Sequence, residues 1–242
     1  MKKALTWHSP RIQQQIKLVR WGHWGVPVLL FPTAGGDAEE IERFHLIGAL
    51  WPLIESGKVK VYSCDSLAGR AWISDHTSAE HSAWVQNRYL EAVYHEVVPA
   101  IRHDCQNDDI EIVTAGASIG AFNAVASICR HPDVFSLAIG LSGTYDLERQ
   151  MPEGINDDFY FSSPLHFVPN LGENEILDQL RKRFVLMAFG AGRWENPEQT
   201  WRMASVLGLR GIPNRVDEWH GNYDHDWPAW REQLPQYLAD HV

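Results

Sequence analysis

A serine between glycines is the part of this chain whose residue types and spacing point most directly to chemistry. The segment Gly116–Gly120 reads G-A-S-I-G, after an apolar run at 110–115 and before a run of small residues at 121–126. A strand, a tight turn and a helix in this order form a nucleophile elbow, which exposes Ser118 above a sheet. The helix N-terminus behind the serine favours a developing oxyanion. The alternative is an ordinary turn in which Ser118 caps the helix.

A serine nucleophile needs a base, and the base needs a carboxylate that orients it. In chains with a nucleophile elbow, the order is serine, acid, histidine, and the histidine lies in the loop after the last strand. His220 and His225 both follow the expected last strand at 214–219. We favour His225 because it lies beside the start of the final helix. His220, at the end of the strand, is interpreted as a structural residue.

Two carboxylates are candidates for the acid. Glu195 lies just past an expected strand at 184–189, and Asp146 lies just past the preceding strand at 135–141. We favour Glu195 and keep Asp146 as its competitor. The alternative role for Glu195 is that of an acidic residue that stabilises the N-terminus of the helix beginning at Pro197.

Two backbone N–H groups are needed to bind the oxyanion. One is expected from Ile119, the residue after the nucleophile. The other is expected from the small, glycine-rich segment 32–36 after the strand at 28–31, with Ala34 favoured and Gly35 second. A phosphate-binding loop is excluded here, because no lysine with an adjacent serine or threonine follows the glycines.

Composition narrows the function classes further. The net charge of −10 argues against a nucleic-acid partner. The N-terminus lacks the apolar stretch of a signal peptide, no apolar run could span a bilayer, and three scattered cysteines form no disulfide framework. We therefore expect a cytoplasmic protein with a small-molecule ester substrate, and a homo-oligomer is compatible with the sequence. The His and Asp residues at 219–227 match no metal-ligand spacing, so no metal or organic cofactor is expected.

Strand and helix patterns alternate along the 242 residues. This alternation predicts a single α/β domain with a mostly parallel sheet covered by helices on both faces. Expected strands lie at 5–8, 15–21, 28–31, 59–64, 110–115, 135–141, 184–189 and 214–219. Expected helices lie at 37–54, 79–102, 121–126, 197–209 and 228–240, with a loop at 65–72. The irregular excursion at 147–182 is interpreted as a lid, a pocket wall or an oligomer contact.

Four segments together resemble the putative esterase family of α/β-hydrolases, which includes enterochelin esterases, S-formylglutathione hydrolases and mycolyltransferases. They are Phe31–Gly36, the elbow, Leu141–Leu147 and His225–Trp230, and the likeness runs from about Trp21 to Leu238. The resemblance implies an α/β-hydrolase fold and, by likeness to the mycolyltransferases, the acid and base roles of Glu195 and His225. The chain departs from the family at Pro32-Thr33, where many members carry aspartate-glycine in the oxyanion loop.

The expected function is that of a serine carboxylesterase that uses Ser118, His225 and Glu195. The alternatives are an acyltransferase with the same triad and a catalytically silent binding protein of this fold. Trp194, Trp227 and Tyr160 are the expected substrate-binding residues. They belong to a larger set of loop aromatics that also includes Trp72, Phe159 and Phe161.

Overall fold

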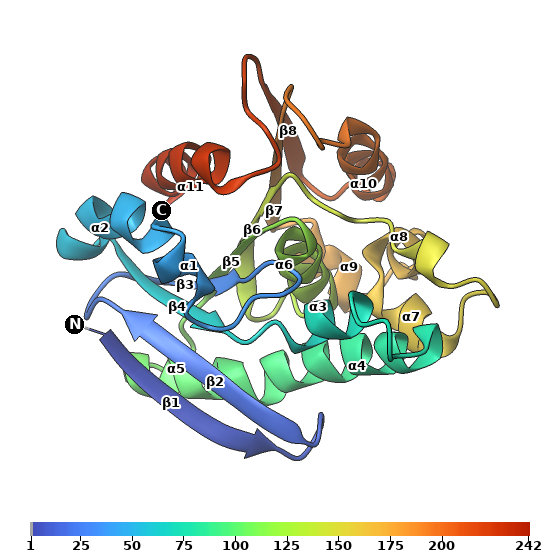
Figure 1. Ribbon diagram of the computed structural model, residues 1–242, viewed down its shortest axis with the longest axis horizontal. Coiled ribbons are helices and arrows are strands. Elements are labelled where there is room, and N and C mark those ends of the chain that lie inside the picture. The colour runs from blue at the N-terminus through green and yellow to red at the C-terminus, as the bar shows by residue number, and fades with distance from the viewer. Residues whose placement is uncertain (1) are drawn as a thin grey trace.

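One eight-stranded sheet forms the centre of the computed structural model, which describes residues 2–242 (Figure 1). The strand order is β1-β2-β4-β3-β5-β6-β7-β8. Strand β1 pairs antiparallel with β2 and β2 pairs antiparallel with β4, whereas all other pairs are parallel. The strands are β1 (Lys2–Ser9), β2 (Gln14–Trp21), β3 (Val26–Phe31), β4 (Val59–Cys64), β5 (Ile112–Ala117), β6 (Phe135–Leu141), β7 (Phe184–Gly190) and β8 (Asn214–Trp219). The expected mostly parallel sheet is confirmed.

Helices cover both faces of this sheet. One face is covered by α1 (Glu40–Arg43), α2 (Leu46–Glu55) and α11 (Trp227–His241). The other carries α4 (Ala79–Ala92), α5 (Val98–Cys105), α6 (Ile119–Arg130) and α10 (Pro197–Leu209), together with helices of the excursion. Alternate residues of the strands enter the two buried clusters: Leu29 and Phe31 of β3 face one, and Val28 and Leu30 face the other. This alternation follows from the two-residue period of a strand.

The helix expected at 37–54 is wrong as a single element. His45 has a left-handed backbone, with φ of 63°, and separates α1 from α2. The buried face of α2 consists of Leu46, Ile47, Leu50 and Ile54, whereas Phe44 and Trp51 are exposed. Apolar residues continue at helical spacing across His45, so the sequence pattern gives no sign of the break between α1 and α2.

The loop expected at 65–72 is also wrong, because residues Leu67–Trp72 form helix α3. Gly69 lowers the intrinsic helix propensity of this short segment. Burial of Leu67 and Ala68 against the core stabilises it instead. The helix expected at 79–102 consists of three consecutive segments, α4, the π-helical segment η1 (Val93–Val97) and α5. The wider π-helical turn lies just before Pro99, which has no N–H to donate within the helix.

The excursion at 147–182 contains five short helical elements. They are η2 (Glu148–Gln150), α7 (Asp157–Ser162), α8 (Pro164–Phe167), η3 (Val168–Asn170) and α9 (Glu175–Leu180). Its later part packs into the main core through Leu165, Phe167, Val168, Leu177 and Leu180. Its earlier part, through Leu147, Met151 and Phe159, joins a smaller cluster with Ile119. Its role as a lid or pocket wall stays a prediction.

The carboxyl ends of β3, β5, β6, β7 and β8 lie along one edge of the sheet, because these strands are parallel neighbours. Each is followed by a segment that the sequence singled out. Strand β5, which carries the elbow, lies between β3 and β6. The fold therefore brings the segments after residues 31, 117, 141, 190 and 219 to one edge.

Candidate active site

Ser118 forms a strained turn between β5 and α6. Its backbone lies at φ 58° and ψ −124°, a conformation that costs roughly 1–3 kcal/mol for a residue with a Cβ. A Cβ on Gly116 would collide with the backbone of Gly120, and a Cβ on Gly120 would collide with the carbonyl oxygen of Phe31. The Ser118 N–H donates to the carbonyl of Leu141 at 3.0 Å, which anchors the turn to β6. The two glycines are thus required by close backbone contact.

The side chain of Ser118 makes no capping hydrogen bond with α6 in the described chain. Its Oγ instead lies 3.5 Å from the Oγ1 of Thr144, and the Thr144 N–H donates to the Ser118 carbonyl at 3.1 Å. The serine is half-buried. These contacts argue against a capping role and leave the hydroxyl at the carboxyl edge of the sheet.

Glu195 is a buried carboxylate at the same edge, with a side chain only 3% exposed. Its Oε1 accepts hydrogen bonds from the Ser142 hydroxyl at 2.6 Å and from the Gly190 N–H at 3.2 Å. Its Oε2 is buried without a hydrogen-bond partner among residues 2–242 and lies 3.9 Å from Nδ1 of His225. A shortening of about 1 Å would make this contact a hydrogen bond. Catalytic hydrogen bonds are often long in free enzymes.

Burial shifts both partners of this pair toward their neutral forms. It raises the pKa of the Glu195 carboxyl, against the opposing effect of the Ser142 and Gly190 donors. It lowers the pKa of the His225 imidazole, with a smaller opposing effect of Asp226. A neutral His225 can accept a proton, and an ionised Glu195 can stabilise the imidazolium that results.

The loops after β7 and β8 are held together, and this brings Glu195 and His225 close to each other. The His225 N–H donates to the carbonyl of Arg193 at 3.0 Å. The Arg193 guanidinium binds Asp224 with an Nη2–Oδ2 distance of 2.6 Å, and the Arg193 N–H donates to Asp224 Oδ1 at 2.7 Å. Asp224 is therefore a clamp between the two loops.

The competing residues lie in other surroundings. The side chain of His220 is 82% exposed, and its Nδ1 lies 3.6 Å from Glu218. Asp146 forms an ion pair with Arg202, and its Oδ1 accepts from the Glu148 N–H at 2.9 Å. The structure thus brings His225 and Glu195 together and engages Asp146 elsewhere.

The two N–H groups expected to bind an oxyanion have no hydrogen-bond acceptor among residues 2–242. They belong to Ile119 and Ala34, and the Gly35 N–H is free in the same sense. Ile119 follows β5, Ala34 follows the neighbouring strand β3, and both pack in the same apolar cluster. The Ala34 loop is fixed by Thr33, whose N–H and hydroxyl both donate to the buried Glu40 carboxylate at 2.7 Å. Thr33, where the chain departs from the family pattern, thus holds this loop in place through the Glu40 carboxylate.

The three expected substrate-binding aromatics have different surroundings. Trp194 is 73% exposed, and the Arg193 guanidinium lies 4.8 Å from its ring. Trp227 stacks on Phe44 at a ring separation of 4.8 Å. Tyr160 packs against the main core cluster, whereas Ile119 belongs to the smaller cluster. Trp194 adjoins Glu195 in the loop after β7 and Trp227 begins α11 two residues after His225, whereas Tyr160 lies in α7.

Sequence reasoning missed two residues that contact the predicted triad. Ser142 and Thr144 lie in a segment noted only for its family likeness, and their contacts with Glu195 and Ser118 depend on tertiary structure. Two of the loop aromatics noted in the sequence lie close to this site: Phe159 belongs to the buried cluster that contains Ile119, and Trp72 packs against it.

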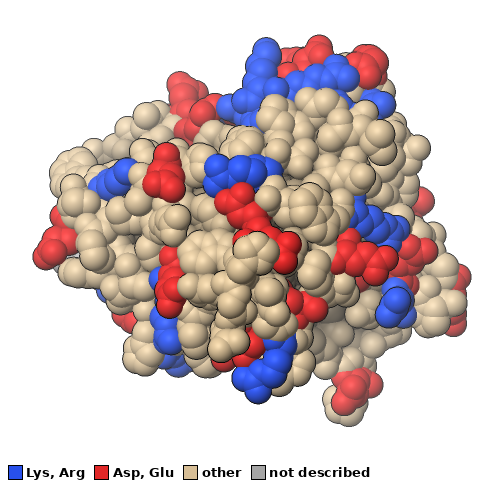
Figure 2. All heavy atoms as spheres, turned by 90° about the horizontal axis from the view of Figure 1, so that it is seen from above, with Lys and Arg blue, Asp and Glu red and all other residues tan. Residues whose placement is uncertain are grey.

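The wider surroundings show scattered rather than clustered charge. Figure 2 shows Lys and Arg side chains interspersed with Asp and Glu on the face seen from above. Among residues 2–242, no group of three His, Cys, Asp or Glu side chains could hold a metal ion. Within the same residues, no helix is long and apolar enough to cross a membrane.

Comparison with known proteins adds evidence of relationship. The family model described as putative esterase matches residues 57–241. A ferulic acid esterase superimposes with a TM-score of 0.75 at 16% identity, over 98% of this chain and 96% of that one. An S-formylglutathione hydrolase from Agrobacterium tumefaciens gives 0.71 at 13% identity, over 100% and 94%. MPT51 of Mycobacterium tuberculosis gives 0.69 at 14% identity, over 99% and 97%. A search of curated proteins finds no match.

Proposed function

The chain belongs to the putative esterase family and is a serine hydrolase of the α/β-hydrolase fold, and from this premise we propose that Ser118, His225 and Glu195 form its catalytic triad. The observation that carries the proposal is the conformation of Ser118, a strained serine at a strand-to-helix turn with φ of 58°. Such strain persists where the surrounding structure requires it and is typical of functional sites.

In the proposed reaction, the Ser118 hydroxyl attacks the carbonyl carbon of an ester or thioester. His225 accepts the serine proton, and Glu195 stabilises the imidazolium through Oε2, which lies 3.9 Å from Nδ1. The N–H groups of Ile119 and Ala34 bind the oxyanion of the tetrahedral intermediate. The imidazolium then protonates the leaving alcohol or thiol, which leaves an acyl group on Ser118.

Water completes the cycle. His225 removes a proton from the water molecule that attacks the acyl-enzyme, and the acid product leaves with Ser118 regenerated. An acyltransferase would use the same groups with an alcohol in place of water. The ferulic acid esterase and the S-formylglutathione hydrolase are named for hydrolysis, and this favours the hydrolase over the transferase.

Partly buried apolar side chains beside the free N–H groups favour an uncharged acyl group. Trp72 and Ala34 both pack against the apolar cluster that contains Ile119, and both are only partly buried. Trp72 is oriented by a hydrogen bond from its Nε1 to the buried Gln86 at 3.2 Å. A charged acyl chain would lose hydration against these side chains without a partner.

The test is turnover of p-nitrophenyl acetate by the wild-type protein and by Ser118→Ala, with and without added methanol. We expect the wild type to release acetate mainly as the free acid, and Ser118→Ala to lose at least about 10⁴-fold in kcat/KM. Methyl acetate as the main product would instead establish the transferase. Unchanged turnover by folded Ser118→Ala would refute the proposed triad.

A further inference from the structure

The buried contacts of Glu195 lead to a side chain that the triad itself does not include. One hydrogen bond to Oε1 comes from Ser142, the first residue after β6. Ser142 is 3% exposed and has a left-handed backbone, with φ of 47°. Its N–H donates to the carbonyl of Ala188 in β7 at 2.7 Å. The residue therefore links the end of β6 to β7, the strand that precedes Glu195.

The Ser142 hydroxyl is itself held by Trp230. The indole Nε1 donates to Ser142 Oγ at 2.9 Å, a fully buried hydrogen bond. Because the indole can only donate, it must use a lone pair of Oγ. The single hydroxyl proton of Ser142 is therefore directed to Glu195 Oε1. Trp230 thus determines the direction of the hydrogen bond that the acid receives.

Trp230 also contacts the base. It lies in the second turn of α11, the helix that begins two residues after His225. Its ring packs edge-on against the imidazole of His225, with ring centroids 5.4 Å apart and planes at 77°. One side chain therefore contacts His225 directly and reaches Glu195 through a single hydroxyl. Its exposure is only 4%, and it is packed among buried apolar residues of α2, β5 and β6.

This arrangement has an electrostatic consequence. Glu195 is buried, and burial favours its neutral, protonated form. The Ser142 and Gly190 donors at Oε1 favour the ionised form and leave Oε2 free to face His225. Without the hydroxyl, the acid–base pair would bind a proton more readily. The pH below which the pair is inactive would then rise.

We propose that Ser142 and Trp230 are positioning residues, which keep Glu195 ionised with Oε2 directed at His225. The inference rests on the proposed function of Glu195 and His225. It deepens that proposal by assigning a role to two residues that neither contact the nucleophile nor belong to the triad. Ser142 acts on the acid directly, and Trp230 acts through Ser142 on the acid and by packing on the base.

The experiment measures kcat, KM and the acid limb of kcat/KM against pH for p-nitrophenyl acetate. Ser142→Ala is expected to lower kcat about 10- to 100-fold, as for the loss of a hydrogen bond to a charged group, with KM nearly unchanged. The acid limb should move to higher pH. Trp230→Phe keeps a ring but removes the donor, so a smaller change in the same directions is expected.

Two controls separate the hydroxyl from the fold. Ser142→Gly relieves the left-handed backbone but also lacks the hydroxyl, so it should match Ser142→Ala. Trp21→Phe removes another buried indole that donates to a glutamate, Glu42, at 3.0 Å, far along the sheet in β2. It should leave kcat and the acid limb unchanged. Thermal unfolding of each variant verifies that it is folded.

Wild-type kcat and an unmoved acid limb in either folded Ser142 variant would overturn the inference. Normal activity of Ser142→Gly beside an impaired Ser142→Ala would overturn it as well, because backbone strain would then be the cause. A failure of the triad proposal is distinguishable. In that case Ser118→Ala, His225→Ala or Glu195→Gln retains turnover, whereas failure of this inference alone leaves all three residues essential.

Discussion

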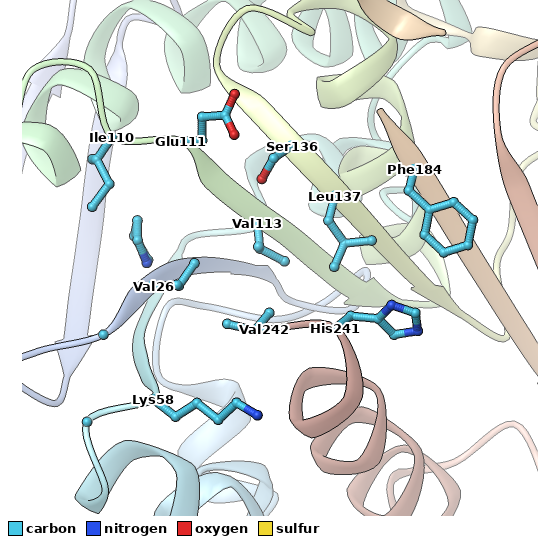
Figure 3. A pocket seen from close by; sticks show the side chains of 13 residues that line it. Val26, Lys58, Ile110, Glu111, Val113, Ser136, Leu137, Phe184, His241 and Val242 are labelled. Atoms are coloured by element: carbon cyan, nitrogen blue, oxygen red, sulfur yellow. The ribbon is translucent and has the colours of Figure 1, made fainter. Parts of the chain in front are cut away.

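The two ends of the parallel sheet each carry a serine, a glutamate and a histidine, but in different physical states. At the carboxyl end these are Ser118, Glu195 and His225. At the amino end, Ser136, Glu111 and His241 line an open pocket of about 960 Å³ (Figure 3). Figure 3 shows Glu111 and Ser136 on one wall and His241 across the pocket beside Phe184. This pocket thus lies away from the strained serine.

Burial and backbone strain distinguish the two sets. The Glu195 side chain is 3% exposed with one oxygen unpaired, whereas Glu111 is 50% exposed and pairs with Arg183 at 2.7 Å. Ser118 has a positive φ, whereas Ser136 lies within strand β6, where the pairing with β5 shifts by one residue, and has no positive φ. Glu111 is already solvated and paired, and ion pairs at such exposed sites contribute little. Residue types alone therefore do not identify an active site, and the presence of a cavity beside them does not either.

The histidines give the largest expected contrast. His225→Ala should lower kcat/KM for p-nitrophenyl acetate by about 10⁴- to 10⁶-fold, because no other base lies beside Ser118 in the proposed mechanism. His241→Ala and His220→Ala, both at exposed positions, should retain nearly full activity. Loss of turnover in His220→Ala with activity kept in His225→Ala would show that the base was assigned wrongly.

The carboxylates should show a smaller contrast. Glu195→Gln keeps the shape of the side chain but removes the charge that stabilises the imidazolium. A loss in kcat of about 10²- to 10⁴-fold is expected. Glu111→Gln should leave kcat unchanged, and so should Asp146→Asn, whose carboxylate binds Arg202. If Asp146→Asn were the impaired variant in steady-state assays, Asp146 would be the acid.

The sequence predicted most of the framework, because periodicity and chain order act locally. Helix α10 and strand β8 have the expected bounds, and the elbow lies between the expected strand and helix. The break at His45 was hidden, because a left-handed histidine leaves no mark in an apolar pattern. Helix α3 depends on burial of Leu67 rather than on its own propensity.

The site was partly predictable for the same reason. Positions at the ends of strands follow from topology, so Glu195 and His225 could be selected from the sequence. The roles proposed for Ser142 and Trp230 could not, because they depend on a hydrogen bond between residues 88 positions apart. The same holds for the Asp224 clamp, which joins loops that are 31 positions apart in the chain.

The smallest expected effect is the position of the acid limb in the wild type. Burial lowers the pKa of His225, and the active form has a neutral imidazole. The midpoint of the acid limb of kcat/KM should therefore lie below about 6.5, the ordinary value for histidine. Activity is retained above this midpoint and is lost as the pH falls through it. A midpoint above 6.5 in the pH profile would contradict the neutral, buried state of His225.

The most direct test of the central claim is covalent labelling with a fluorophosphonate probe, followed by peptide mapping of the modified residue. The structure predicts one labelled peptide, modified at Ser118, in the wild type and in Ser136→Ala, and no label in Ser118→Ala. The serine within β6 should remain unmodified in all three proteins. Absence of labelling in the folded wild type, or label that persists in Ser118→Ala, would contradict the assignment of Ser118 as the nucleophile.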